Sequence, residues 1–253
     1  MRVLITGGEG ALGSRVADAL RKRGHQVAAP GRRGLDAASP MSWRGALAAP
    51  RALEDEDPRG PMSLPSFDVV IACVAWTDVA GCERMPGRSW RSNVVAAIET
   101  AEACLRAGVP LLFTSSDYAK GQGLQTVYGR HKAEAERQVR ARHPLAVVAR
   151  VCHLPPEKAR NYSWLNGVTR SNRIWTEEAA GRVADAVGDA GLASMVHASP
   201  SGRPDDIDIG AQRKTTVAEM VRERWPTHPA LIDVVTDPGE LDRRCGFNVP
   251  RET

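Results

Sequence analysis

The sequence of 253 residues predicts an α/β protein built on a doubly wound parallel sheet. Three observations support this fold class. Strand and helix signals alternate from the N-terminus to about residue 152. A glycine-rich turn joins the first expected strand to the first expected helix. Hydrophobic residues make up 42% of the chain, which is ordinary for a globular domain.

The expected strands are short apolar runs bounded by glycine, proline or polar residues. They lie at 2–6, 26–29, 68–74, 109–115 and 145–151, with helices expected at 11–23, 92–107 and 128–142. Beyond residue 155 the signals weaken. There we expect helices at 177–187 and 216–224, a strand at 194–197 and a polar loop at 199–208. We divide the chain into a first domain, 1–152, and a small second lobe, 153–253, that returns in part to the core of the first domain.

Gly7, Gly10 and Gly13 follow the first expected strand in a G-x-x-G-x-x-G pattern. Gly7 permits a tight turn, Gly10 lets a pyrophosphate approach the backbone, and Gly13 allows the helix to pack on the strand. The free N–H groups at the start of the helix, at Ala11 and Leu12, favour phosphate binding. The turn therefore predicts a dinucleotide cofactor. The alternative is an ordinary glycine-rich loop between a strand and a helix.

The loop after the second expected strand indicates which dinucleotide is bound. An acidic residue there would bind the ribose 2′-hydroxyl of NAD, but Pro30-Gly31-Arg32-Arg33 has none. Arg32 and Arg33 can accommodate a 2′-phosphate. We expect NADP(H), with NAD(H) as the second choice, and assign Asp36 of the same loop to the cofactor site. A solvated arginine pair is the alternative, since Lys and Arg together number 34 in this chain.

Tyr128 and Lys132 are four residues apart and share a face of the helix expected at 128–142. A free tyrosine has a pKa of about 10, and we expect the nearby ammonium to lower it. The same lysine can reach ribose hydroxyls. Ser115 and Ser116 end the strand expected at 109–115, where a hydroxyl could hydrogen-bond a substrate carbonyl. A helix-surface tyrosine, and a turn or cap role for the serines, are the alternatives.

With these motifs in this order, the chain resembles the extended short-chain dehydrogenase/reductases over nearly its whole length, and most closely the dTDP-4-dehydrorhamnose reductase branch. The resemblance rests on the glycine turn, Val74-Ala75-Trp76-Thr77, Ser115-Ser116-Asp117-Tyr118 and Tyr128-x3-Lys132. It implies a Rossmann-type, NADP-binding domain over 1–152 that carries the catalytic residues Ser116, Tyr128 and Lys132, and a small C-terminal substrate lobe over 153–253. Tyr128 and Lys132 would also contact the cofactor. The further cofactor residues that it implies are Val74, Ala75, Asn93 and Val151.

The same alignment of motifs leads us to expect Trp76, Thr77, Asp117 and His153 beside the substrate. A packing role for Trp76 and a loop role for His153 are the alternatives. Only eleven residues separate Ser116 from Tyr128, and the segment 150–176 is short, so the parts that would recognise a sugar are trimmed. Residues 48–64 look like an insertion whose acidic run, Glu54–Asp57, is expected to be a solvated loop.

These residues predict an NADPH-dependent ketoreductase acting on a small-molecule ketone. The expected substrate is the 4-keto group of a nucleotide-linked deoxysugar, in deoxysugar biosynthesis, or a related ketone of secondary metabolism. The first alternative is an epimerase or dehydratase of the same superfamily. The second is a non-catalytic, NADP-binding regulatory subunit, of the kind that accompanies methionine adenosyltransferase.

Composition limits the other classes. The net charge of +4 is mild, and no arginine stripe carries interleaved aromatic residues, so we expect no nucleic-acid partner. No apolar run suits a membrane span, and the N-terminus reads as a strand rather than a signal peptide. The five cysteines lack a C-x-x-C pair and the six histidines lack metal spacing. We expect a cytoplasmic protein with reduced thiols and no metal, which could form a homodimer.

Overall fold

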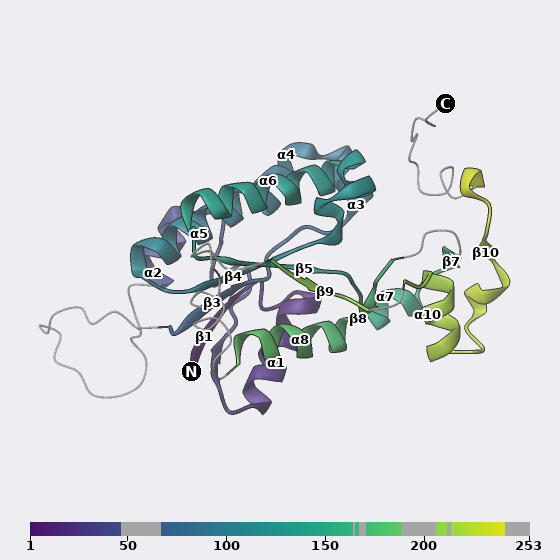
Figure 1. The fold of residues 1–253 in the computed structure, drawn as a ribbon, viewed down its shortest axis with the longest axis horizontal. Coiled ribbons are helices and arrows are strands. Elements are labelled where there is room, and N and C mark those ends of the chain that lie inside the picture. Colours follow the sequence, from purple (N-terminus) through teal and green to yellow (C-terminus); the bar gives the residue numbers. More distant parts are fainter. Residues whose placement is uncertain (47–66, 164, 167–170, 189–205, 212–213, 241–253) are drawn as a thin grey trace, which may run out of the picture.

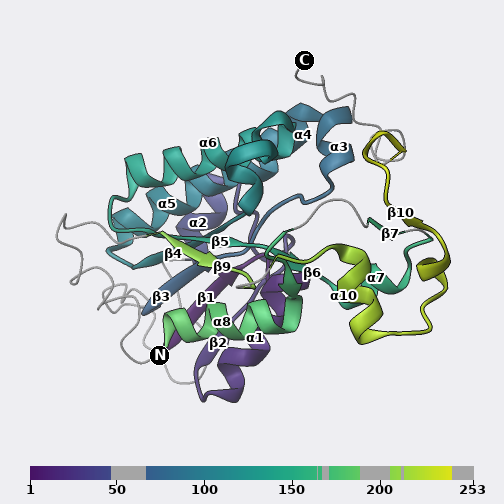
Figure 2. The same ribbon diagram turned by 45° about the vertical axis from the view of Figure 1, so that its right-hand side comes forward.

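A computed structural model describes residues 1–46, 67–163, 165–166, 171–188, 206–211 and 214–240. Its main feature is a six-stranded sheet with helices on both faces (Figures 1 and 2). The strand order is β2-β1-β3-β4-β5-β9, and all five pairings are parallel. The chain runs outward from β1 to β2 and then crosses back to β3. The switch point therefore lies between β1 and β3, where sheets of this kind bind ligands.

Five strands occupy the places that the sequence predicts. They are β1 (Arg2–Thr6), β2 (Gln26–Ala28), β3 (Val69–Ala72), β4 (Leu111–Ser115) and β5 (Val147–Val151). The sixth, β9 (Ile207–Ile209), pairs with β5 and corrects the prediction of a loop through residue 208. Its three residues are too few for alternation to show, and Asp208 interrupts the two isoleucines. The strand expected at 194–197 and the segment 48–64 lie outside the described residues.

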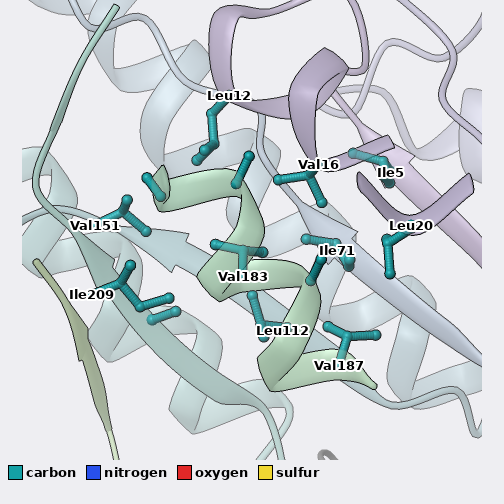
Figure 3. Packing of buried hydrophobic residues seen from close by; sticks show 14 of the residues in the cluster. Ile5, Leu12, Val16, Leu20, Ile71, Leu112, Val151, Val183, Val187 and Ile209 are labelled. Carbon is teal, nitrogen blue, oxygen red and sulfur yellow. The ribbon is translucent and has the colours of Figure 1, made fainter. Parts of the chain in front are cut away.

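Alternate side chains of the strands pack into two separate hydrophobic cores, one on each face of the sheet. Val3 and Ile5 of β1 face α1 (Ala11–Lys22) and α8 (Thr176–Val187), which cover one face of the sheet (Figure 3). Leu4 faces the other side, which is covered by α2 (Pro40–Ala46), α5 (Ala96–Ala107) and α6 (Val127–Arg142). The helices predicted at 11–23, 128–142 and 177–187 are confirmed within a residue or two. None of the helices in the described residues is long and apolar enough to cross a membrane.

The helix predicted at 92–107 has an irregular start. Two short helices, α3 (Val79–Arg84) and α4 (Pro86–Trp90), lead into a π-helical turn, η1 (Arg91–Val95), before α5 begins. Asn93 lies in this turn and is buried. A π-helical turn inside a longer helix often accompanies a functional site, because it changes the direction of the side chains that it carries.

The remaining elements form a small lobe beyond the carboxyl ends of the strands (Figure 2). It contains α7 (Pro156–Arg160), α10 (Val217–Arg224) and η4 (Pro229–Ile232). Two-residue strands pair as β6 (His153–Leu154) with β8 (Ile174–Trp175), and β7 (Leu165–Asn166) with β10 (Val234–Val235). The lobe has its own apolar cluster, and α10 confirms the helix predicted at 216–224. Since α8 and β9 pack on the main sheet, the boundary at residue 152 stays a prediction.

Candidate active site

A cavity of about 620 Å³ lies at the carboxyl ends of the central strands. Segments that follow β1, β3 and β4 line it, together with the end of β5 and part of α6. Most of the predicted site residues meet here. They are Gly10, Ala11, Leu12, Ala75, Thr77, Ser116, Asp117, Tyr128, Lys132, Val151 and His153. The topology brings them together because the strands are parallel and all their carboxyl ends meet at one edge of the sheet.

The glycine turn has the geometry that a phosphate site requires. Gly7 has a φ of +69°, in the left-handed region that favours glycine. A Cβ at Gly13 would overlap the carbonyl oxygen of Gly7, so the helix can start only with glycine at that position. The N-cap residue of α1 is Gly10, which has no side chain to accept hydrogen bonds from the first N–H groups. The first N–H groups of α1 therefore have no side-chain cap and lie beside the cavity.

Asn93 lies outside the cavity lining but holds a segment that lines it. Its Oδ1 accepts a hydrogen bond from the Trp76 amide at 2.8 Å, and its Nδ2 donates to the Trp76 carbonyl at 3.1 Å. Nδ2 also donates to the Ser89 hydroxyl at 3.1 Å. Ser89 in turn is hydrogen-bonded to Nδ1 of His131, on α6, at 2.8 Å. This chain of contacts fixes the loop after β3, which carries Ala75 and Thr77, against the helix that carries Lys132.

Replacing Ser89 with alanine should loosen that loop. Ser89 is fully buried, and its loss leaves the ring nitrogen of His131 without this partner. We expect the free energy of unfolding to fall by about 1–3 kcal/mol. Dinucleotide affinity should also fall severalfold. Urea unfolding and fluorescence titration measure the two effects. Ser92→Ala, three residues further along in η1, is the control, and equal effects in both variants would contradict the role given to Ser89.

Tyr128 is buried at the cavity wall, packed edge-on against the ring of Tyr118. Burial raises the pKa of its phenol, and a hydrogen bond with Ser116 opposes the shift only in part. The predicted lowering of this pKa by Lys132 is therefore wrong for this structure. The lysine ammonium faces elsewhere, since it donates to the Thr114 carbonyl at 2.9 Å and lies 4.4 Å from the centre of the Phe113 ring.

Lys132 is only 1% exposed, which is unusual for a lysine. Burial lowers the pKa of its ammonium to about 8, although Glu136, one turn along α6, acts in the opposite direction. Glu136 also accepts two hydrogen bonds from Arg150, at 2.8 and 2.5 Å. An ammonium kept in so apolar a place is costly to the fold, which favours a functional role over a structural one.

Ser116 has the cap role considered for it, and it also lines the cavity. Its hydroxyl caps the short helix η2 (Asp117–Ala119) by accepting a hydrogen bond from the Tyr118 amide at 3.3 Å. The same hydroxyl donates to Oδ1 of Asp117 at 3.1 Å and is a hydrogen-bond partner of Tyr128. Asp117 also accepts from the Cys152 thiol, at 3.1 Å. The cap thus holds the hydroxyl beside the phenol in the cavity.

Other predicted residues lie away from the cavity lining. Arg32 and Arg33 are exposed in the loop after β2. Asp36 accepts a hydrogen bond from Arg91 at 2.8 Å and another from the Ala38 amide at 3.2 Å. The ring of Trp76 packs against the guanidinium of Arg88, 4.4 Å from its carbon. The substrate role for Trp76 and the cofactor roles for the other three stay predictions.

The lobe adds residues that no sequence motif indicates. Lys158, Asn161, Tyr162 and Arg173 line the same cavity as the glycine turn and α6. His153 lies among them, with Nδ1 2.9 Å from the Thr176 hydroxyl, and burial lowers its pKa to about 4. Isolated basic and polar residues outside any motif carry no local signal, so these positions could be found only from the three-dimensional structure.

Comparisons with known proteins place this site in a family. The family model described as the RmlD substrate binding domain matches residues 1–165. A dTDP-4-dehydrorhamnose reductase of Streptomyces griseus is 32% identical over 150 residues, which cover 54% of this chain and 44% of the relative. A probable dTDP-4,6-dihydroxy-2-methyloxan-3-one 4-ketoreductase of Streptomyces antibioticus is 27% identical over 267 residues, covering 88% and 83%. The chain thus spans less than half the length of the first of these relatives.

The fold is shared with solved reductase structures. A dTDP-4-dehydrorhamnose reductase of Bacillus anthracis, in complex with NADP, superposes with a TM-score of 0.72 over 97% of this chain and 93% of its own, at 15% identity. The sheet order, the glycine turn and the family match agree with the motifs read from the sequence. The chain belongs to the RmlD substrate binding domain family, within the extended short-chain dehydrogenase/reductases.

Proposed function

We propose that this protein reduces a ketone with NADPH. The observation that carries the proposal is that Tyr128, Ser116 and Lys132 line the same cavity as Gly10 of the glycine turn. A phosphate cradle and a proton donor in one cavity suit a reaction in which a dinucleotide delivers hydride and the protein delivers a proton. The dTDP-4-dehydrorhamnose reductases among the relatives support this reaction class.

The described residues fit a bound dinucleotide. A Cβ at Gly13 would overlap the Gly7 carbonyl oxygen, and a Cβ at Gly7 would crowd the Val74 backbone, so the turn needs glycine at both positions. The start of α1 offers N–H groups to a pyrophosphate. Lys132 would hold ribose hydroxyls through its ammonium, and Ala75 and Val151 would line the cofactor. When bound, the cofactor supplies the hydride. Arg32 and Arg33 favour NADP(H), and the Bacillus anthracis relative was solved with NADP.

Tyr128 is the proton donor in this proposal. Because burial raises the pKa of its phenol, the group stays protonated through the neutral range, as an acid in a reduction must. In the reduction, the phenol oxygen would give its proton to the oxygen of the ketone. Ser116, held beside the phenol by its cap contacts, would hydrogen-bond the same oxygen. In this proposal the protein itself orients the ketone oxygen and donates one proton to it.

The substrate that fits best is a 4-keto sugar linked to a nucleotide. Lys158 and Arg173 bring two cationic side chains to the cavity, where they can contact the phosphates of such a substrate. The relatives from Streptomyces griseus and Streptomyces antibioticus are both named for dTDP-linked sugars. The first test is NADPH oxidation by the pure protein with a panel of dTDP-4-keto-6-deoxysugars. No turnover on any of them, with NADPH bound, would contradict this substrate class.

Lys158→Ala should separate phosphate recognition from the chemistry. Lys158 is exposed at the cavity, so its removal should leave the fold intact. We expect KM for a nucleotide-linked ketone to rise about five- to tenfold, because one charged contact to a phosphate is lost, while kcat changes little. Turnover of a small ketone without phosphate should not change. Lys22→Ala, at the far end of α1, is the control. An equal rise in KM for both ketones would contradict the assignment.

A further inference from the structure

The loop after β2 lies directly on the glycine turn. The Gly8 amide donates a hydrogen bond to the Pro30 carbonyl at 3.2 Å, and a Cβ at Gly8 would overlap the backbone of Ala29. The two segments are therefore held together so closely that glycine is required at position 8. A side chain at this junction therefore contacts both the glycine turn and the loop after β2.

Glu9 places a carboxylate at this junction. A Cβ built at Gly31 would overlap the carboxyl carbon and both oxygens of Glu9, so the carboxylate rests against the Cα of Gly31. Gly31 is the third residue after β2. This is the place where an acidic residue of the strand end binds the ribose 2′-hydroxyl of NAD in this kind of fold. Pro30-Gly31-Arg32-Arg33 has no acidic residue, and the glycine turn places the Glu9 carboxylate there.

Of the two carboxylates near this junction, we consider Glu9 the one whose charge acts on a bound ribose. Asp36, in the same loop, is paired with Arg91 at 2.8 Å, so its charge is offset. Arg32 and Arg33 follow Gly31 directly and carry the opposite charge. A 2′-phosphate at this junction would be attracted by the arginines and repelled by Glu9, whereas a 2′-hydroxyl could donate a hydrogen bond to the carboxylate.

We propose that Glu9 determines the choice between NADP(H) and NAD(H), and that its carboxylate keeps NADH a working cofactor despite Arg32 and Arg33. The inference rests on the proposed function, since it concerns the cofactor of that same site. The same carboxylate weakens binding of the ribose that carries a 2′-phosphate and strengthens binding of the ribose that carries a 2′-hydroxyl.

The test is the ratio of NADH to NADPH dissociation constants, measured by fluorescence titration of the purified full chain. Glu9→Gln keeps the shape of the side chain and removes its charge. We expect tighter NADPH binding and weaker NADH binding in this variant, with the ratio rising on the order of tenfold. Raising the salt concentration should shrink the difference, because Glu9 is exposed to solvent. Arg33→Gln should move the ratio in the opposite direction.

Glu102→Gln is the matched control, because Glu102 lies in the half of α5 that leads into the start of β4, away from the cavity. It should leave the ratio unchanged. If Glu9→Gln changes both dissociation constants by the same factor, or neither, the inference is overturned while the proposed function stands. If the wild-type protein binds neither nucleotide, the proposed function fails and the inference with it.

Discussion

Tyr128→Phe should lower kcat by about 10²–10⁴-fold, which is the usual contribution of a positioned general acid. The phenol oxygen is the only atom that the change removes. Burial keeps this group protonated, and the hydroxyl of its neighbour Ser116 donates its hydrogen bond to Asp117. Stopped-flow or steady-state NADPH oxidation measures the loss. NADPH affinity should change little, because the assigned contacts of the cofactor are made by Lys132 and the glycine turn.

Tyr118→Phe is the matched control for this experiment. Tyr118 lines the same cavity, and its ring centre lies 5.8 Å from that of Tyr128. The control therefore removes a second phenolic oxygen from the same surroundings, and we expect a reduction in kcat of less than about tenfold, since the residue is not placed to donate the proton. Full activity in Tyr128→Phe would disprove the proton-donor assignment, whatever the control shows.

Lys132→Met should abolish detectable turnover and, at pH 7, make the protein more stable. The wild-type chain must keep a fully buried ammonium charged at that pH. Replacing such a charge with an apolar side chain of similar length is expected to stabilise the fold by about 1–3 kcal/mol. The loss of activity follows from the loss of the group that would hold the ribose. A gain in stability with a loss of function is the behaviour expected of a residue kept for chemistry.

The stability difference should depend on pH in a defined window. Burial lowers the pKa of Lys132 from 10.5 to about 8. Between these values the unfolded chain binds more protons at this lysine than the folded chain, so wild-type stability rises with pH there. The full shift corresponds to about 3 kcal/mol. The advantage of Lys132→Met should therefore shrink from pH 8 to pH 10.5, as measured by urea unfolding. Lys120→Met, on the surface, controls for the loss of one lysine. A constant advantage across the window would contradict the burial argument.

The sequence determined the parts of this protein whose causes are local. The five predicted segments became strands β1 to β5, because a short, mostly apolar segment between turns is typically buried as a strand. The three glycines predicted the turn that they form, because a tight turn excludes a Cβ at specific positions only a few residues apart in the sequence. The spacing of Tyr128 and Lys132 predicted a shared helix face, and both line the cavity. The π-helical turn at Asn93 and the short strand β9 lacked such a local signal.

Only the tertiary structure decided the electrostatics of the site. Lys132 is close in sequence to Tyr128, yet its ammonium points to the Thr114 carbonyl, and burial by distant segments raises the pKa of the phenol. Lys158 joins the cavity from the lobe, and Glu9 reaches Gly31 across a gap of more than twenty residues in the chain. Desolvation and through-space contacts depend on which segments the fold brings together, and no pattern within one segment records them.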